Sequence, residues 1–388
     1  MYGIKTYNKI AAIGLDIFDK SKYEIGDDIA APVGAIVRSA SLHEEQFPDS
    51  LLAIARAGAG TNNIPSEELA KRGVCVFNTP SANANAVKEL VLAGLFLASR
   101  KVVPAIEWAK TLKGQGDMVG KLVEKGKGAF AGPEIRGKKL GVIGLGAIGV
   151  LVANAANHLG MTVYGYDPFL SLQNAWNLSH NIKRANELTE IFESCDYISL
   201  HLPLNKNTKG TVNADLLAKC RDGVRILNFA RDGLVDSQAM LDALASGKVA
   251  SYVVDFPTEE MIGVENVVAI PHLGASTPES EDNCAVMAVN ELIDYIENGN
   301  VVNSVNLPAL TMARSAEIRF AVIHKNVPSM ISSITQTFAD DNVNIENLMN
   351  KSRDEIAYTV LDVNECDTEA VTKDLEAIEG VIRVRVIK

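Results

Sequence analysis

The chain lacks a cysteine framework, because its 5 cysteines are scattered, odd in number and free of any Cys-x-x-Cys pair. This pattern argues against a disulfide scaffold and against a zinc site, so no metal is expected. No apolar run approaches the ~20 residues that span a bilayer. The opening segment, MYGIKTYNKIAAIGLDIFDK, also lacks the apolar core of a signal peptide. We therefore expect a cytoplasmic protein.

Positive charge is also in short supply, since 37 Lys and Arg residues face 48 Asp and Glu residues, for a net charge of -11. The field of such a molecule repels polyanions, so a nucleic-acid partner or an acidic membrane is not expected. One local basic stretch lies between Lys110 and Lys139. Either it is a solvated face, or it holds a small anion.

What the sequence does contain is alternation of short apolar runs with helix-like stretches, over 388 residues. This length predicts two or three domains, and the alternation predicts α/β domains with doubly wound parallel sheets. Long helical stretches are expected over Ala84–Lys113 and Glu279–Asn298, with Pro328 in the first turn of a later helix. From Ile318 to Lys388 a β-α-β-β-α-β order predicts a separate ferredoxin-like domain.

The segment KKLGVIGLGAIG carries the spacing G-x-G-x-x-G at Gly144, Gly146 and Gly149. A predicted strand precedes it, a predicted helix follows, and a second strand ends at Asp167. In this context the turn favours a dinucleotide whose pyrophosphate meets the helix N-terminus. An acid at the ribose repels a 2′-phosphate, so NAD is expected rather than NADP.

Three polar residues follow the ends of predicted strands: Arg231, Glu259 and His272. Arginine suits a substrate carboxylate, and histidine suits proton transfer near neutral pH. Strand ends of a parallel sheet meet at one edge, where a ligand binds. The residues alone leave open the alternative that these are two surface charges and a structural histidine.

Several segments together resemble the D-isomer-specific 2-hydroxyacid dehydrogenase family, in order along the chain: IVRSAS, ARAGAGTNNI, NTPSANANAVKELVL, GVIGLGAIG, HLPLNKNTKG, LNFARDGLVD, DFPTEE and PHLGAST. The resemblance implies a discontinuous substrate-binding domain at residues 1–90 and 285–308. It implies an NAD-binding Rossmann domain at 91–284. The C-terminal domain is expected at 318–388.

By this resemblance Arg231 binds the substrate carboxylate, His272 is the general acid/base and Glu259 is its partner. The cofactor-binding residues implied are Gly144, Gly146, Ala147, Ile148, Gly149, Asp167, His201, Pro203, Thr208, Ala230, Asp255 and Gly274. The substrate-binding residues implied are Arg56, Ala57, Gly58, Ala59, Asn83 and Lys127. Local departures from the family pattern are Asp232, Ser237 and Glu260.

The C-terminal segment FAVIHKNVPSMISSITQTFADDNVNIENL resembles an ACT domain, a module that commonly binds amino acids. The resemblance implies an L-serine site at His324, Asn326 and Asn344, formed across a subunit interface. Ser329 departs from the glycine usual after the proline. The domain could instead serve only as an interface, and a homodimer or homotetramer is expected in either case.

The two resemblances in one chain imply NAD-dependent oxidation of D-3-phosphoglycerate to 3-phosphohydroxypyruvate, the first step of L-serine synthesis. Arg56, with Lys125 or Lys127, is expected to bind the phosphate. One alternative is a glyoxylate or hydroxypyruvate reductase, or another D-2-hydroxyacid dehydrogenase. A second alternative, of a different class, is a non-catalytic NAD-responsive binding protein.

Overall fold

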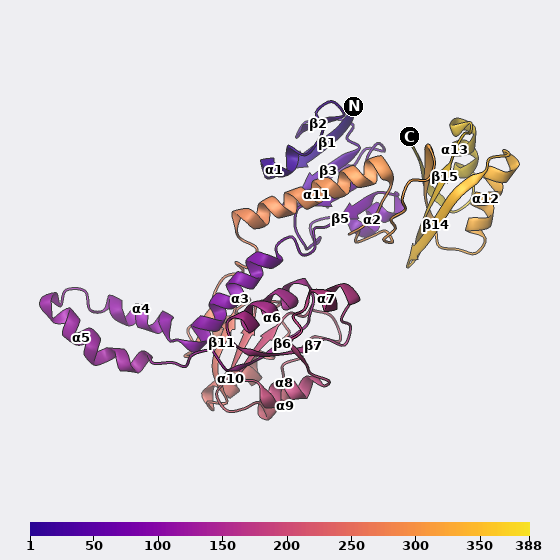
Figure 1. Ribbon diagram of the computed structural model, residues 1–388. Helices are drawn as coiled ribbons and strands as arrows, with labels where there is room; N and C mark the ends of the chain where they lie inside the picture. Colours follow the sequence, from indigo (N-terminus) through magenta and orange to yellow (C-terminus); the bar gives the residue numbers. More distant parts are fainter. The chain divides into compact units, whose positions relative to one another are not determined.

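A computed structural model describes all of residues 1–388 and divides the chain into two compact units (Figure 1). The first unit contains Met1–Asn83 and Thr277–Lys388, and the second contains Ala84–Ser276. The expected domain boundaries at 90/91 and 284/285 fall inside helices, so those exact limits stay predictions. No helix of the structure is both long enough and apolar enough to cross a membrane.

The first unit contains a five-stranded parallel sheet with the order β2-β1-β3-β4-β5. This order is typical of doubly wound folds. Strands β3 and β4, inside the sheet, are buried on both faces, which explains the continuous apolar runs GAIV and AIA in their sequences. The strands are β1 (Tyr2–Tyr7), β2 (Tyr23–Gly26), β3 (Gly34–Val37), β4 (Ala53–Arg56) and β5 (Cys75–Phe77), and the short helices are α1 (Ala12–Leu15) and α2 (Ser66–Lys71).

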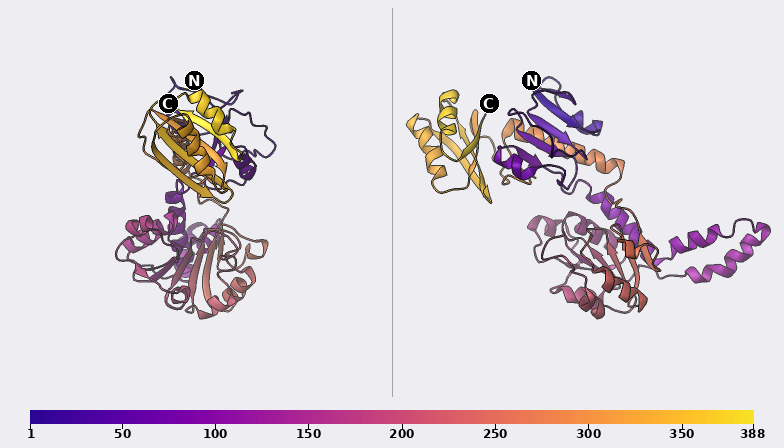
Figure 2. Two further views of the ribbon diagram at one scale, coloured as in Figure 1. Left: turned by 90° about the vertical axis from the view of Figure 1, so that its right-hand side faces the viewer. Right: turned by 180° about the vertical axis from the view of Figure 1, so that it is seen from behind.

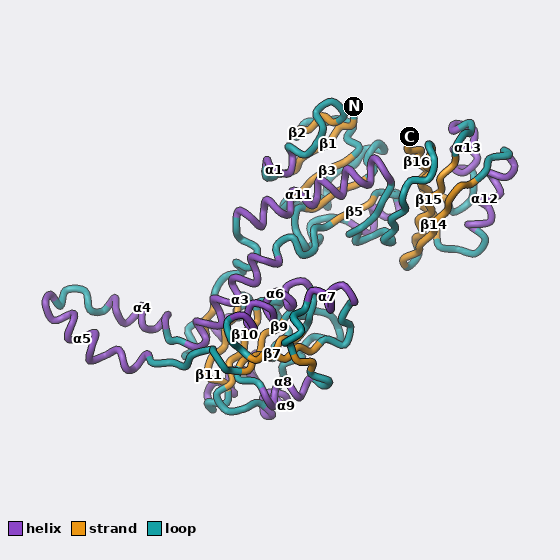
Figure 3. Tube along the Cα trace, viewed as in Figure 1, coloured by secondary structure: helices purple, strands orange, loops and turns teal.

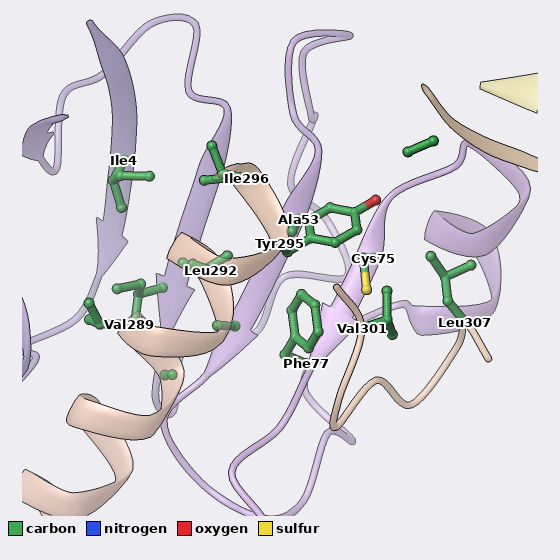
Figure 4. Packing of buried hydrophobic residues seen from close by; sticks show 14 of the residues in the cluster. Ile4, Ala53, Cys75, Phe77, Val289, Leu292, Tyr295, Ile296, Val301 and Leu307 are labelled. Atoms are coloured by element: carbon green, nitrogen blue, oxygen red, sulfur yellow. The ribbon is translucent and has the colours of Figure 1, made fainter. Parts of the chain in front are cut away.

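Helix α11 (Pro278–Asn298) covers one face of this sheet. Figure 4 shows Val289, Leu292, Tyr295 and Ile296 of the helix among Ile4 and other side chains of the strands. Thr277 caps the start of the helix, because its side chain accepts a hydrogen bond from Ser280 N, and Gly299 caps its end in the left-handed region. This end was predicted correctly from the sequence.

The second unit contains a seven-stranded parallel sheet with the order β12-β11-β10-β9-β6-β7-β8. The order reverses beside β6, as in dinucleotide-binding folds, where the ligand crevice lies at the carboxyl ends of the strands. The strands are β6 (Lys139–Ile143), β7 (Thr162–Tyr166), β8 (Lys183–Arg184), β9 (Tyr197–Leu200), β10 (Val224–Asn228), β11 (Val249–Val254) and β12 (Val267–Ala269). The helices around it include α6 (Ala147–His158), α7 (Leu172–Asn177), α8 (Leu188–Ser194), α9 (Ala214–Lys219) and α10 (Ser237–Ala245).

The helix expected over Ala84–Lys113 is two helices, α3 (Ala84–Ser99) and α4 (Val102–Lys110). Pro104 explains the break: in a continuous helix its ring would clash with the carbonyl of Arg100, and it has no N–H to bond that carbonyl. Helix α5 (Val119–Gly126) then runs back beside α4, and the two project from the rest of this unit (Figure 3). The ring centroids of Trp108, in α4, and Phe130, after α5, lie 5.3 Å apart, so these two segments pack against each other.

The C-terminal domain is an antiparallel sheet of order β14-β15-β13-β16 with two helices on one face, as the β-α-β-β-α-β pattern predicted (Figure 2). Pro328 precedes α12 rather than lying in its first turn, because Ser329 adopts φ +70° and the helix begins only at Met330. The elements are β13 (Ile318–Lys325), α12 (Met330–Asp340), β14 (Ile345–Arg353), β15 (Ile356–Val363), α13 (Thr368–Glu376) and β16 (Val381–Ile387).

The other face of this C-terminal sheet belongs to the same hydrophobic core as α11, through residues such as Ile323, Tyr358 and Val360. Side chains of the sheet also donate to the last backbone carbonyls of α11. Tyr358 Oη reaches Gly299 O at 2.7 Å, and Arg319 Nη1 reaches Asn298 O at 2.8 Å. Arg385 Nη2 reaches two carbonyls of the preceding turn, Tyr295 O at 3.2 Å and Ile296 O at 3.0 Å. The C-terminal domain therefore caps this helix.

Candidate active site

The glycine turn between β6 and α6 depends on two close backbone contacts. Gly144 has φ +91°, and a Cβ there would lie 2.5 Å from His201 O. A Cβ on Gly149 would lie 1.9 Å from Gly144 O. A Cβ on Gly146 would meet no atom within 4 Å, so this position is open to a ligand. Helix α6 begins at Ala147, which places the free N–H groups of its first turn beside the open position.

Asp167 follows β7 and is fixed against the glycine turn. Its Oδ2 accepts a hydrogen bond from Leu145 N at 2.8 Å, and its Oδ1 accepts one from Phe169 N at 2.8 Å. Both oxygens keep further lone pairs for ribose hydroxyl groups. Beside it lies a cavity of about 510 Å³ whose walls are partly apolar, as at Leu170 and Ile182, and partly polar, as at Arg184. The carboxylate, this cavity and the open turn fit the adenosine half of NAD.

Arg231 and His272 follow β10 and β12, the two strands that flank β11 in the sheet. Arg231 Nη1 donates to Ala230 O at 2.7 Å. The His272 ring packs against Phe256 with centroids 4.3 Å apart. Burial, and then the nearby Arg231 charge, lower the pKa of His272. The sheet thus brings a guanidinium and a neutral imidazole to one edge.

Glu259 lies exposed in the short 3-10 helix Glu259–Met261, and no hydrogen bond joins it to His272. Its part as the histidine's partner stays a prediction. The departure Glu260 follows in the same turn. Asp232 holds its own loop, because its Oδ1 accepts a hydrogen bond from Gly233 N at 2.7 Å.

Asp255 is the most strongly perturbed acid at this edge. It is 1% exposed, neither carboxylate oxygen has a hydrogen-bond partner, and Gly274 lies next to Oδ2. Burial raises the pKa of Asp255 to about 6, against the opposing charge of Arg231. An orphaned, buried carboxyl group at the strand ends fits a position facing the cofactor.

The remaining cofactor-side residues lie on the loop after β9. His201 Nε2 lies 2.9 Å from Ser199 Oγ, and desolvation lowers the pKa of His201 to about 4, so the ring is neutral at neutral pH. Thr208 Oγ1 donates to Pro203 O, which closes the loop. This loop starts beside the glycine turn, since His201 N donates to Ile143 O at 2.8 Å.

Sequence reasoning missed Asn228, a residue 2% exposed at the end of β10 whose side chain bonds the backbone of Ala230 and Arg231. The signal was a polar residue directly after the apolar pair Ile226 and Leu227, at the end of the strand. Ser237, another departure, begins α10 directly after the capping residue Asp236.

The candidate substrate residues of the first unit surround the end of β4. Arg56 Nε donates to Arg38 O at 3.0 Å, and burial lowers the pKa of Arg56. A Cβ on Gly58 would lie 2.6 Å from Arg56 Nη1, so glycine leaves room for the guanidinium. Ala57 N donates to Val37 O at 2.8 Å, and Ala59 O accepts a hydrogen bond from the side chain of Asn78. Asn83 is the last residue of the first segment of this unit. Lys127 belongs to the second unit, where it pairs with Glu124.

The three candidate effector residues are not gathered within one chain. His324 is 2% exposed, with Nδ1 2.8 Å from Lys325 O and Nε2 2.8 Å from Thr359 Oγ1. Asn326 Nδ2 donates to Asp354 O at 3.0 Å at the same end of the sheet. Asn344 lies before the start of β14, at the opposite end, because Ile345 and Ile318 both pair with Val363.

Comparisons with known proteins identify the types of domain in the chain. The family model "D-isomer specific 2-hydroxyacid dehydrogenase, NAD binding domain" matches residues 92–274, and the model "AHAS small subunit-like ACT domain" matches residues 320–383. A relative named D-3-phosphoglycerate dehydrogenase from Haemophilus influenzae is 34% identical over 349 residues, which are 87% of this chain and 81% of the relative.

Two solved structures share the fold. An NAD⁺-bound 3-phosphoglycerate dehydrogenase from Entamoeba histolytica has a TM-score of 0.59 and 27% identity, covering 80% of this chain and 99% of that one. An apo D-mandelate dehydrogenase from Rhodotorula graminis has a TM-score of 0.66 at 22% identity, with 80% and 99% covered. The chain belongs to the D-isomer-specific 2-hydroxyacid dehydrogenase family, with an NAD-binding domain in its second unit and an ACT domain at its C-terminus.

Proposed function

We propose that this enzyme oxidises D-3-phosphoglycerate to 3-phosphohydroxypyruvate with NAD, the first step of L-serine synthesis. The observation that carries the chemistry is that Arg231 and His272 follow the ends of β10 and β12, which flank β11 in the sheet that holds the dinucleotide turn. The relatives named D-3-phosphoglycerate dehydrogenase support the choice of substrate.

The mechanism assigns one task to each side chain. Arg231 binds the substrate carboxylate through its planar guanidinium, which orients C2. His272, held neutral by its lowered pKa, takes the proton of the C2 hydroxyl group. NAD, when held at the glycine turn, would supply the acceptor for the hydride that leaves C2. In the reverse direction the imidazolium returns the proton, and Glu259 is proposed to stabilise that charged form once it approaches the ring.

The cofactor is proposed to lie along Gly144–Gly149, with Asp167 on the adenosine ribose and Asp255 near the other end. His201, Pro203, Thr208, Ala230 and Gly274 complete this set. The proposed substrate domain is 1–90 with 285–308, the NAD domain is 91–284, and the ACT domain is 318–388.

Arg56, together with Lys127, is proposed to bind the substrate phosphate. Arg56→Ala should raise KM for 3-phosphohydroxypyruvate much more than KM for hydroxypyruvate, because only the former carries the phosphate. Arg72→Ala is a matched control, since Arg72 also donates to a backbone carbonyl, Phe47 O at 2.9 Å, in the same unit. An unchanged ratio of the two KM values would reject Arg56.

We also propose that the chain acts as a homodimer or homotetramer in the cytoplasm. Helices α4 and α5 carry exposed apolar side chains, including Ile106, Val119 and Val123, which are suited to burial in a subunit contact. All five cysteines are free, which fits a reducing compartment.

L-Serine is proposed as an effector bound by His324 and Asn326 of one subunit and Asn344 of another. Isothermal titration of the full chain with L-serine should give saturable heat that Asn326→Ala removes. Because His324 is buried, its contribution requires a small opening at the end of the sheet. Absence of heat, with no change in turnover, would reject the site.

The experiment for the whole proposal is NADH oxidation with 3-phosphohydroxypyruvate, beside hydroxypyruvate, glyoxylate, pyruvate and 2-oxoglutarate. A preference for the phosphorylated acid, lost in His272→Ala, supports the proposal. A preference for a small oxoacid would instead identify another D-2-hydroxyacid dehydrogenase. NADH binding without turnover of any acid would favour the binding-protein alternative.

A further inference from the structure

Asn228 holds both ends of the short loop that presents Arg231. Its Nδ2 donates to Arg231 O at 3.0 Å, and its Oδ1 accepts from Ala230 N at 3.2 Å. The same Nδ2 lies 3.5 Å from the hydroxyl group of Tyr252, on the neighbouring strand β11. One buried side chain therefore pairs the backbone acceptor and donor that the turn leaves free.

The geometry points to Asn228 as a positioning residue for Arg231, one that fixes the backbone from which the guanidinium reaches the substrate carboxylate. This inference rests on the proposed function, because it takes Arg231 as the carboxylate-binding residue. Asn228 itself does not touch the substrate. Its effect passes through the backbone carbonyl of Arg231.

Only an amide satisfies both contacts. A flipped amide would set its N–H groups against the N–H of Ala230 and its oxygen against the carbonyl of Arg231. Aspartate keeps the acceptor for Ala230 N but places a negative oxygen against Arg231 O. Since the site is 2% exposed, water cannot readily replace the lost donor. Asn228→Asp thus removes one contact and keeps the size of the side chain.

A second consequence concerns the charges around Arg231. Burial lowers the pKa of His272 and raises that of Asp255, and the positive charge of Arg231 lowers both. If the guanidinium moves away from this edge, the pKa of His272 rises. In a variant that adds no charge, a change in the pH dependence of turnover therefore reports the position of Arg231, which a general loss of stability does not.

The test compares wild type with Asn228→Asp. We expect KM for the 2-oxoacid to rise on the order of 10- to 100-fold, the loss produced by a misplacement of about 1 Å. In the uncharged variant Asn228→Ser, the midpoint of the acid limb of kcat/KM for hydroxy-acid oxidation should also move to higher pH. This arm uses serine because the carboxylate of Asn228→Asp would raise the pKa of His272 by its own charge. Affinity for NADH should change less than KM for the 2-oxoacid does, because Asn228 bonds neither the glycine turn nor Asp167.

Asn154→Asp is the matched control, because Asn154 also bridges a backbone carbonyl and a backbone N–H, those of Asn177 and Ser179, each at 2.8 Å. It should leave the KM for the 2-oxoacid and the pH midpoint unchanged. Equal effects of Asn228→Asp and Asn154→Asp on KM, or an unchanged KM in Asn228→Asp with an unchanged midpoint in Asn228→Ser, would overturn the inference. If Asn228→Asp does not fold, Asn228→Ser is measured in its place, since its hydroxyl group is a weaker donor of similar polarity.

Failure of this inference and failure of the proposed function give different results. Any 2-oxoacid serves the test, because the carboxylate is common to all of them, so a preference for an unphosphorylated acid contradicts only the proposed substrate. If wild type turns over no acid, the Kd of the carboxylate analogue oxamate is measured on the NADH-bound protein. A weaker Kd in Asn228→Asp than in Asn154→Asp supports the inference, and equal Kd values overturn it.

Discussion

Arg319 offers the sharpest test of how the C-terminal domain is held. Its side chain is fully buried and forms two hydrogen bonds with Asp362, Nε to Oδ1 at 2.6 Å and Nη2 to Oδ2 at 2.9 Å. It also donates to three carbonyls, those of Asn298, Met312 and Ala313. Arg319→Met keeps much of the volume and leaves the carboxylate buried without its partner.

Removing one member of a buried ion pair costs about 3–5 kcal/mol of the free energy of unfolding. At roughly 2–4 °C per kcal/mol for a unit of this size, Tm of the first unit should fall by about 10 °C. Burial raises the pKa of Asp362, but hydrogen bonds from Arg319 and Ser315 outweigh it and hold that pKa below its ordinary value. The wild-type advantage should therefore be complete at neutral pH and should narrow as the pH falls through that lowered pKa.

The assay is calorimetric unfolding of the full chain at pH 7 and at acid pH. The double variant Arg319→Met, Asp362→Leu should recover most of the loss, because no unpaired charge remains. Arg314→Met is the control: this exposed arginine also donates to carbonyls but pairs with no carboxylate, and it should change the free energy of unfolding by less than about 0.5 kcal/mol. A change within about 1 kcal/mol for Arg319→Met would refute the reasoning.

Three further predictions concern the active site. The pKa of His272 is lowered from the ordinary histidine value of 6.5, so the acid limb of the pH profile for hydroxy-acid oxidation should have its midpoint below 6.5. Arg231→Gln should move that midpoint upward. A wild-type midpoint above 7 would contradict this. Asp167→Ala should raise KM for NAD by about tenfold, the loss of a charged hydrogen bond, and admit NADP, which steady-state kinetics with both cofactors would show or disprove. Gly149→Ala should lower Tm, because its Cβ would lie 1.9 Å from a backbone carbonyl. Gly146→Ala meets no atom, so it should keep Tm and weaken NADH binding in a fluorescence titration. Equal losses of Tm in the two variants would count against this account.

Much of the fold could be predicted because the periodic apolar runs and the glycine turn are local signals. The parallel strands, the end of α11 at Gly299 and the β-α-β-β-α-β order were all confirmed. The break before α4 was also visible in the sequence, as Pro104, but the helical periodicity on both sides concealed it. The delayed start of α12 depends on the left-handed conformation of Ser329, which a non-glycine residue does not reveal in advance.

The site could be predicted only in part, because burial and hydrogen-bond partners are tertiary properties. The strand ends place Arg231 and His272 as expected, since a parallel sheet dictates their common edge. Nothing local indicates that Asn228 bonds the backbone of the next turn, or that both nitrogens of His324 have partners inside the C-terminal domain. The contact of His324 with Thr359 joins two strands, and the local contacts of Asn228 depend on the conformation of the turn after β10.

The capped end of α11 restricts how this chain can be shortened or recombined. A chain cut at the linker after Leu310 would lack the side chains that donate hydrogen bonds to four carbonyls at the end of the helix, between Tyr295 and Gly299. It would also expose the apolar residues that Tyr358 and Val360 cover. An ACT domain transplanted from another protein would need the same tyrosine and arginines in the same register to seal that end. Residues at the end of α11 and the C-terminal-domain residues that contact them are therefore expected to change together in evolution.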